Sequence, residues 1–226
     1  MNYEQKKGFS LTEVLFAIGI LAVGMVFIAG VFPIAIRFVT LAAERSIAAV
    51  AADEAFAKIK LYDVNWTDPN FAMGQTVPFG KITKINDFEF AYPSTSLNPD
   101  DKQYYWSALC RKTGPRDVQV TVFVCRKTGL FLNRRLPVPV GVSKISNNVL
   151  QIEAGKETSI NDGYTIVDDA KGYIYRVLER SSAFPDNIIL SSQWQGGATG
   201  AVWVVPPPVG GGRYTCVAVY QKVIRF

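Results

Sequence analysis

Histidine is missing from this chain of 226 residues. Histidine is the commonest general base in enzymes and the commonest side-chain ligand of metals. Its absence excludes Ser-His-Asp and Cys-His nucleophilic catalysis and every zinc site that needs an imidazole.

Cysteine is scarce, with only Cys110, Cys125 and Cys216 and no CxxC spacing. This pattern excludes a zinc ribbon and a thioredoxin motif, and it allows at most one disulfide within the chain. Clustered positive charge is also lacking, because the net charge is +5 but the basic residues lie singly or in pairs. Without a basic tract, the sequence predicts no nucleic-acid partner.

One long apolar run is present, from Val14 to Ile36, and it contains no charged residue. At ~1.5 Å per residue a helix of this length reaches ~35 Å, enough to cross a hydrocarbon core of ~30 Å. A cleaved secretory signal has a shorter apolar region, of ~7 to 15 residues, with its cleavage site directly after it. The length of the run therefore favours a transmembrane helix.

The charges beside this run predict its orientation. Lys6 and Lys7 precede it, and Arg37 and Arg45 follow it. This modest bias, after so short a leading segment, favours a cytoplasmic N-terminus. Everything after Arg37 is then expected to lie outside the cytoplasm.

Glu13 is an acidic residue at the start of the apolar segment. Inserting a carboxylate within a lipid-spanning helix costs a few kcal/mol on insertion scales. Such a group is by default expected to have a functional partner. Two explanations stay open on these grounds. Either Glu13 reaches the headgroups beside Lys6 and Lys7, or it has a functional partner.

The order of residues around Glu13 resembles a known signal. Basic residues are followed by Gly8, by Phe9, by the segment Ser10 to Leu15 (SLTEVL) and then by the apolar run. This order resembles the class III signal of type IV pilins and of the pseudopilins of type II secretion. The continuation AIGILAVGM (Ala17 to Met25) is most similar to the minor pilins and minor pseudopilins, and the resemblance extends to about Leu61.

The resemblance implies that a membrane aspartyl prepilin peptidase cuts between Gly8 and Phe9 and methylates the new amine of Phe9. It also implies that Glu13 pairs with the Phe9 amine of a neighbouring subunit when helices pack into a filament. Two charges that are each costly in lipid become tolerable when they are paired. The expected partners are therefore other pilins or pseudopilins, the peptidase and the inner membrane.

Two positions depart from the pattern of that family. Many pilins have a proline where this chain has Gly30, and here the proline is Pro33; the residue before Glu13 is usually aliphatic and here is Thr12. These departures leave the processing site intact. They do not allow the details of filament packing to be transferred residue by residue.

The segment from Arg37 to Tyr62 is rich in alanine and lacks glycine and proline, so it is expected to continue the helix. We therefore predict one helix from Ser10 to about Leu61, and Glu54 and Lys58 are spaced for a favourable ion pair on its surface. An apolar stripe that should pack on a sheet is formed by Leu41, Ala48, Ala52, Phe56 and Ile59.

From Tyr62 to Asn86 the chain is expected to be irregular. Short alternating runs rich in β-branched and aromatic residues follow, separated by glycine, proline, asparagine and aspartate, and they predict antiparallel strands. These runs are residues 87–92, 104–111, 117–126, 148–153, 163–168, 172–180, 187–192, 201–205 and 213–226.

The predicted fold class is α+β, with a long N-terminal helix packed on an antiparallel β-sheet domain of several hairpins. Four segments are expected along the chain. They are a prepilin leader (1–8), the membrane and filament-core half of the helix (9–36), the amphipathic half (37–61) and an extracytoplasmic β-rich domain (62–226).

The cysteines leave several states open. If a hairpin turn lies at Gly114 to Arg116, Cys110 faces about Val120, which is too far from Cys125 for a disulfide. Cys216 could pair with either cysteine, and buried free thiols are the third possibility.

The sequence requires no cofactor, but calcium could bind in the acidic turns that contain Asp100, Asp101, Asp162, Asp168 and Asp169. Major pseudopilins often hold calcium in such a loop, and aspartate oxygens suit this ion. There is no EF-hand spacing, and aspartate in turns also serves local hydrogen bonds. Separately, the proline- and glycine-rich segment Val204 to Tyr214 is expected to be an exposed contact loop.

The sequence supports a structural subunit of a filament, a minor pilin or pseudopilin, with no catalytic activity. The presence of Glu13 argues against the initiating tip subunit, which in secretion systems often lacks this acid. One alternative is a membrane-anchored extracytoplasmic binding or adhesive β domain. A further alternative is an anchored enzyme, although no carboxylate pair stands in a catalytic motif. The contact area of an adhesive domain would come from Trp66, Trp106, Trp194 and Trp203.

Overall fold

The computed structural model describes residues 8–96, 98, 101–127, 135–208 and 214–226. The chain divides into two compact units, Met1–Glu44 and Arg45–Phe226. Some predicted features fall outside the described residues: the leader before Gly8, Asp100, and residues 209–213 of the expected contact loop.

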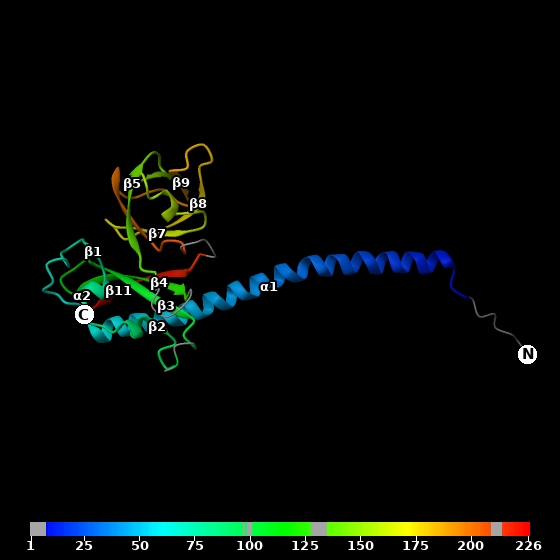
Figure 1. Ribbon diagram of the computed structural model, residues 1–226, viewed down its shortest axis with the longest axis horizontal. Coiled ribbons are helices and arrows are strands. Elements are labelled where there is room, and N and C mark those ends of the chain that lie inside the picture. Colours follow the sequence, from blue (N-terminus) through cyan, green and yellow to red (C-terminus); the bar gives the residue numbers. More distant parts are fainter. Residues whose placement is uncertain (1–7, 97, 99–100, 128–134, 209–213) are drawn as a thin grey trace, which may run out of the picture. The chain divides into compact units, whose positions relative to one another are not determined.

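Helix α1 runs from Leu11 to Tyr62 and contributes residues to both units (Figure 1). It continues through Pro33, so the predicted single helix is confirmed to within a residue at each end. The helix ends where Asp63 takes a left-handed conformation, with φ of 59°. A left-handed residue directly after the last turn is a common helix terminator, because it turns the chain away from the helix axis.

The remaining elements belong to the second unit. Two short helical turns, η1 (Asp87–Phe90) and η3 (Glu157–Ser159), and helix α2 (Phe79–Ile82) accompany eleven strands among the described residues. The strands are β1 (Thr76–Pro78), β2 (Ala91–Tyr92), β3 (Tyr104–Lys112), β4 (Asp117–Arg126), β5 (Val138–Lys144), β6 (Val149–Ile152), β7 (Thr165–Asp168), β8 (Ile174–Arg180), β9 (Asn187–Leu190), β10 (Thr199–Val204) and β11 (Cys216–Arg225).

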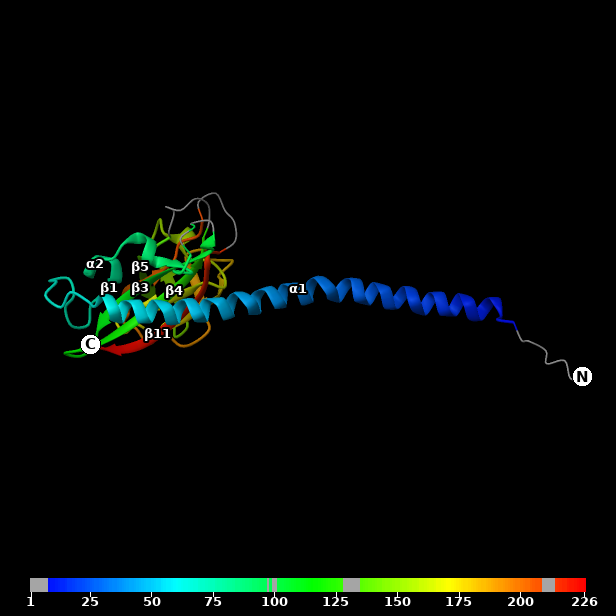
Figure 2. The same ribbon diagram turned by 90° about the horizontal axis from the view of Figure 1, so that it is seen from below.

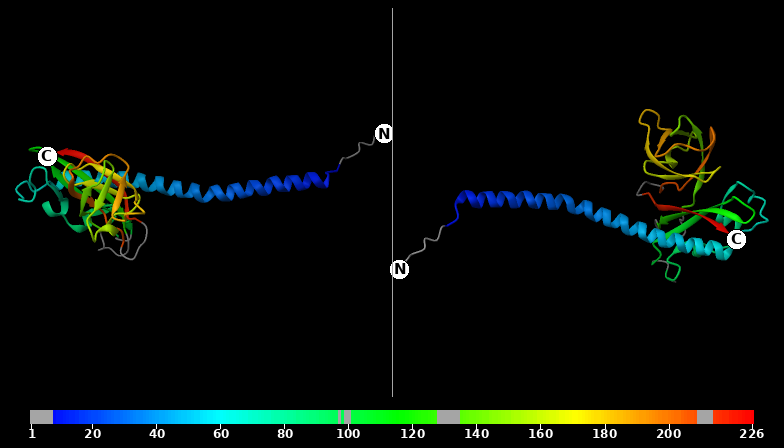
Figure 3. Two further views of the ribbon diagram at one scale, coloured as in Figure 1. Left: turned by 90° about the horizontal axis from the view of Figure 1, so that it is seen from above. Right: turned by 180° about the vertical axis from the view of Figure 1, so that it is seen from behind.

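These strands form two separate antiparallel structures. A five-stranded sheet has the order β1-β3-β4-β11, with β2 also paired to β3, and a closed barrel has the order β10-β5-β6-β9-β8-β7. The right view of Figure 3 shows the yellow-green to orange barrel strands apart from the green and red strands of the sheet. All barrel strands come between β4 and β11 in sequence, so the barrel is an insertion between two neighbouring strands of the sheet.

One face of the sheet packs on the C-terminal part of α1, which crosses β3, β4 and β11 in Figure 2. The helix contributes small side chains to this core: Ala48, Ala51, Ala52 and Ala55 are almost fully buried, as is Ile59. Alternate residues of β3 and β4, among them Trp106 and Val120, meet them from the sheet. The predicted helix stripe is thus confirmed at Ala48, Ala52 and Ile59, whereas Phe56 is only half-buried.

The opposite face of the sheet packs on the barrel. Tyr105, Leu109 and Phe123 form a cluster there with Val167 and Trp203 of the barrel. Because both faces are covered, β4 is buried along most of its length rather than alternating between core and solvent.

Polar contacts fix the turn after β7 on the sheet. Thr76 Oγ1 donates to the Asp169 carbonyl at 2.7 Å, and Gln221 Nε2 donates to the Gly172 carbonyl at 2.7 Å. These bonds join residues far apart in sequence, so they specify how this turn meets the sheet.

Two local predictions are wrong, and one strand was not predicted. Residues 87–90 form η1 instead of a strand, because the Asn86 side chain accepts a hydrogen bond from the Phe88 amide at 3.1 Å and caps the turn. The segment 62–86 is not wholly irregular, since it contains β1 and α2. Strand β5 was not expected, because Pro139 and Gly141 interrupt the usual strand pattern.

Candidate functional site

The apolar surface of α1 in the first unit is not covered by the rest of the described chain. Among the described residues, α1 is the one helix long and apolar enough to cross a membrane, and none of its most apolar stretch is buried. Large side chains are exposed on all its faces, including Leu11 (80%), Leu15, Phe16, Ile20 and Phe27. Apolar surface of this extent requires lipid or partner helices to cover it.

The first turn of α1 contains one of the two bonds of a capping box, the one from the Ser10 amide to Glu13, while Ser10 Oγ shares a hydrogen bond of 2.7 Å with Thr12 Oγ1. Ser10 is the residue before the helix and Glu13 is the third residue within it. Glu13 Oε2 accepts a hydrogen bond from the Ser10 backbone amide at 2.9 Å, and the Val14 amide donates to the Ser10 carbonyl at 3.2 Å. Glutamate at this position satisfies an amide that the helix itself leaves without a partner.

The capping bond uses one carboxylate oxygen of Glu13 and leaves the other, Oε1, without a hydrogen bond among the described residues. The residue is exposed. Its negative charge lies at the helix N-terminus, where the positive end of the helix dipole stabilises an anion. Glu13 is therefore held in place by its own helix while keeping an oxygen for a second donor.

Gly8 and Phe9 lie outside the helix, directly before the cap, and both are exposed. A Cβ atom at position 8 would have no neighbour within 4 Å. The peptide bond between Gly8 and Phe9 is thus accessible to a protease that binds an open backbone. The structure places this bond and Glu13 at the same end of the helix.

The capping role of Glu13 was not anticipated, although the sequence contains the signal for it. Ser10 is followed by a glutamate three positions later and by an apolar run, which is the pattern of a capping box.

The three thiols are free in the structure. Cys110 faces Val120 in the β3–β4 hairpin, as predicted, and it lies in the core beneath the helix. Cys125 faces Cys216 across β4 and β11, on the other side of the sheet. Burial raises the pKa of the Cys110 thiol and that of the Tyr105 hydroxyl well above their ordinary values, so both groups are protonated at neutral pH.

The carboxylates expected to hold calcium serve local hydrogen bonds instead. Asp168 accepts from the amides of Ala170 and Lys171, and Asp169 Oδ1 accepts from Trp203 Nε1 at 2.6 Å. Asp162 accepts from the Arg180 amide at 2.8 Å. Within the described part of the chain these acids and their neighbours form no group of three or more metal-binding side chains. Calcium at these acidic turns stays a prediction.

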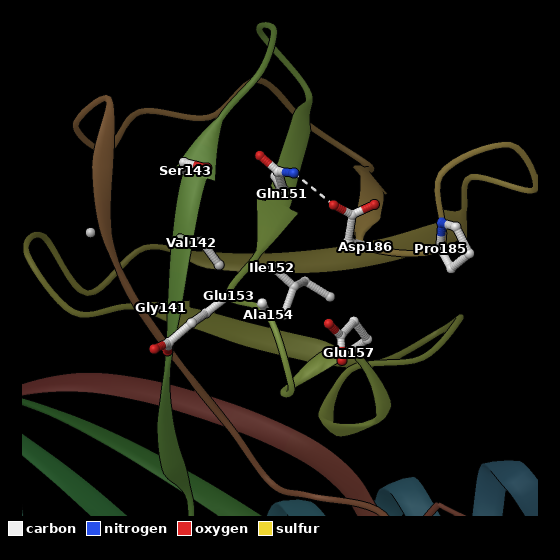
Figure 4. A pocket seen from close by; sticks show the side chains of 11 residues that line it. Gly141, Val142, Ser143, Gln151, Ile152, Glu153, Ala154, Glu157, Pro185 and Asp186 are labelled. Atoms are coloured by element: carbon white, nitrogen blue, oxygen red, sulfur yellow. Dashed lines mark hydrogen bonds between the residues drawn. The ribbon is translucent and has the colours of Figure 1, made fainter.

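An acidic hollow of ≈ 690 Å³ lies on the barrel between β5 and β6 (Figure 4). Glu153, Glu157 and Asp186 line it, and Figure 4 shows Gln151 and Asp186 pointing toward each other, joined by a hydrogen bond of 2.6 Å. The hydrogen bond from the Gly155 amide lowers the pKa of Glu157 and keeps it ionised. Glu157 therefore lacks the raised pKa of a general acid.

The tryptophans do not provide the contact area expected for an adhesive surface. Trp106, Trp194 and Trp203 are buried, and Trp66 is half-buried against Phe71 and Phe226. They are packing residues of three hydrophobic clusters. The prediction that they form a binding surface is therefore wrong for these three residues.

Residues 5–29 match the family described as the prokaryotic N-terminal methylation motif. No curated protein and no solved structure matches the chain. The motif implies, in general, processing by a prepilin peptidase and assembly with other pilins, and with the apolar helix it suggests anchoring in a membrane through the N-terminus. The N-terminal segment of this chain, a methylation motif leading into one long apolar helix, fits a type IV pilin-like or pseudopilin protein.

Proposed function

We propose that the chain is a minor pilin or pseudopilin, a structural subunit of a type IV pilus or of a type II secretion-like filament. A prepilin peptidase cuts between Gly8 and Phe9 and methylates the new amine of Phe9. The subunit is stored in the inner membrane with its N-terminus in the cytoplasm and the unit Arg45–Phe226 outside it.

The observation that carries this proposal is the methylation motif at residues 5–29, which runs directly into the uncovered apolar part of α1. The helix supplies an apolar surface that can move from lipid to neighbouring helices. Such a transfer needs no catalytic group, and in a filament the same surface would be buried between subunits.

The proposal gives Glu13 a physical task. Cleavage before Phe9 creates a positive amine at the end of the helix where the dipole is already positive, which is unfavourable in an apolar surrounding. The second carboxylate oxygen of Glu13, Oε1, can accept a hydrogen bond from the amine of a neighbouring subunit. The pair fixes the register of two helices that are otherwise held by non-directional apolar contacts.

Two variants of Glu13 separate charge pairing from helix capping. Glu13→Gln keeps an oxygen that accepts from the Ser10 amide but removes the charge, whereas Glu13→Ala removes both. We expect both variants to be processed, and the share of processed protein in sheared filaments relative to the inner membrane to fall roughly tenfold or more. Removing one partner of a desolvated ion pair costs about 3–5 kcal/mol, which is more than enough for that loss.

Normal assembly of the Glu13→Gln protein, with a defect only in Glu13→Ala, would show that Glu13 acts through the helix cap alone. Normal assembly of both variants would also contradict the proposed pairing. N-terminal mass of each variant is the control that processing has occurred.

A further inference from the structure

Cys125 and Cys216 lie directly opposite each other in the antiparallel pair of β4 and β11. Opposite residues in such a pair have Cα atoms about 4.5–5.5 Å apart and side chains on the same face. Disulfides span Cα separations of about 4.4–6.8 Å. The register, which shifts by one residue between Cys216 and Ala218, therefore brings the two cysteines to positions within the range that a disulfide can span.

Further contacts place both thiols together. Cys125 belongs to the cluster on the barrel-facing side of the sheet, and Cys216 packs against that cluster. The Cys216 thiol lies near enough to Cys125 to contribute to the raised pKa of the Cys125 thiol, and its hydrogen bond goes to the Ala218 carbonyl at 3.7 Å. Directly beside this pair, the Arg126 amide donates to the Thr215 carbonyl at 2.8 Å, so the two strands are held together there.

Cys110 is excluded as a partner by the same geometry. It faces Val120 in the hairpin and lies in the core on the helix-facing side of the sheet. Strand β4 also separates its strand, β3, from β11. The sequence alone left Cys216 free to pair with either cysteine, and the register selects Cys125.

The two cysteines lie where the chain leaves the sheet for the barrel and where it returns. The chain leaves the sheet after β4, builds the barrel, and returns to β11. We propose that Cys125 and Cys216 form a disulfide that joins the two connections of the barrel where they meet the sheet. The closed ring contains the whole inserted barrel, and cross-links that close long loops reduce the entropy of the unfolded chain most.

The bond requires an external disulfide as the oxidant, and in that respect it rests on the proposed function, which puts this unit in an oxidising compartment. Cys216 is half-buried and Cys125 is fully buried, so Cys216 is the accessible thiol. Its thiolate attacks the external disulfide, forms a mixed disulfide and releases one thiolate. The Cys125 thiolate then attacks Cys216 Sγ and displaces the second thiolate, so that two cysteine thiols are oxidised and one external disulfide is reduced to two thiols.

Burial, with the neighbouring Cys216 thiol, raises the pKa of the Cys125 thiol well above its ordinary value. Little Cys125 thiolate is then present in the folded, reduced protein. The exchange is consequently expected during folding, before the barrel covers this face of the sheet.

Peptide mapping tests the proposal on the full chain extracted from its native membrane into detergent without reductant. The protein is denatured with iodoacetamide and digested with trypsin. We expect residues 117–126 to be linked to residues 214–222, two hydrogen atoms lighter than the sum of the two peptides. Residues 103–111, which contain Cys110, should be alkylated.

Alkylation of both Cys125 and Cys216, or a link that includes the Cys110 peptide, overturns the proposal. The N-terminal mass of the same sample separates its failure from that of the proposed function. Free thiols in a protein with methylated Phe9 overturn the disulfide alone, whereas the expected link in a protein that keeps Met1 upholds the disulfide without the pilin processing.

Thermal unfolding provides a second readout with a matched control. Dithiothreitol should lower the melting temperature of the wild type and of Cys110→Ala by about 5–15 °C. The melting temperature of Cys216→Ala should not respond to the reductant. An equal response of Cys216→Ala would contradict the proposal.

Discussion

Gly172 ends the turn that joins β7 to β8 and that meets the five-stranded sheet. Its φ of 72° lies in the left-handed region, and its carbonyl accepts the bond from Gln221. A Cβ at this position would lie 2.5 Å from Gln119 Oε1. Glycine is therefore required here both by the backbone and by the close approach of the sheet.

Replacement of this glycine should weaken the fold through both effects. We expect Gly172→Ala to lower the free energy of unfolding by about 2–3 kcal/mol, since the left-handed conformation costs about 1–2 kcal/mol and the displaced Gln119 adds to it. Gly163→Ala is the matched control, because Gly163 has φ of 77° but no atom within 4 Å of its Cβ position. Urea unfolding of both variants measures the difference, and equal losses would show that the contact with Gln119 contributes nothing.

Cys110 makes the stability of the fold sensitive to alkaline pH. Burial raises the pKa of its thiol above the ordinary value of 9.0, so the unfolded chain loses this proton first. The stabilisation is complete below pH 9 and is lost as pH rises above it, with a slope of about 1.4 kcal/mol per pH unit for this group. We expect the unfolding free energy of Cys110→Ala to fall less steeply than that of the wild type between about pH 9 and 11. Parallel curves would contradict the assignment.

Among single residues, the sequence allowed those with a chemical signature to be identified. Gly8, Phe9 and Glu13 stand out because their order is specific, and the facing of Cys110 and Val120 followed from counting through the hairpin. That Cys216 faces Cys125 could not be found by such counting. It depends on where β11 enters the sheet after the whole barrel has been built, and local spacing contains no information on that.

At the scale of elements, the buried face of α1 is made of alanines. Ala48, Ala51, Ala52 and Ala55 leave room for the bulky side chains of the sheet, such as Trp106 and Val120, to approach the helix backbone. Small side chains on one partner and large ones on the other fill the core to the density of native proteins. The close fit predicts that this face tolerates little added volume.

An added side-chain volume at Ala52 should be more harmful than the same side chain on the exposed face. Ala52→Leu overpacks the core and is expected to cost about 1–3 kcal/mol, which lowers the melting temperature by about 2–10 °C. Val50 is 56% exposed, so Val50→Leu should change stability by less than about 0.5 kcal/mol. Thermal unfolding in detergent compares the melting temperatures of the two variants. Similar effects of both would contradict the assignment of this helix face to the core.

Elements with a clear periodicity of apolar residues could be predicted. Elements that depend on local side-chain hydrogen bonds or on packing against neighbouring strands could not. The helix and the strands β3 and β4 follow directly from periodicity. The η1 turn depends on the Asn86 cap, which overrides the strand pattern of residues 87–90. In β5, a Cβ at Gly141 would lie 2.8 Å from Glu153 Oε2, so the glycine leaves room for the Glu153 side chain, which follows β6.

At the scale of the molecule, the closure of the barrel could not be predicted. It requires β10 to pair with both β5 and β7, and β6 to pair with β9, which are contacts between strands that are not consecutive. Periodicity identifies strands but does not choose their partners. The α+β class followed from the order of elements, whereas the division of the β part into a sheet and an inserted barrel depends on these long-range pairings.

The two units also divide the functional assignments. The methylation motif, the Glu13 cap and the uncovered apolar surface all belong to the first unit, and they carry the proposed filament role. The second unit contains the buried cores, the acidic hollow and the cysteine pair. A subunit of this kind would share its assembly chemistry with other pilins and differ from them in the domain that it presents.

The intact mass and N-terminal sequence of the protein from its native membrane test the central proposal most directly. The proposed function predicts a chain that has lost Met1 to Gly8, begins at Phe9 and carries one additional methyl group on its N-terminal amine. An intact Met1, or an N-terminus beyond Arg37, would contradict it and would leave a β domain that is anchored or secreted by another route.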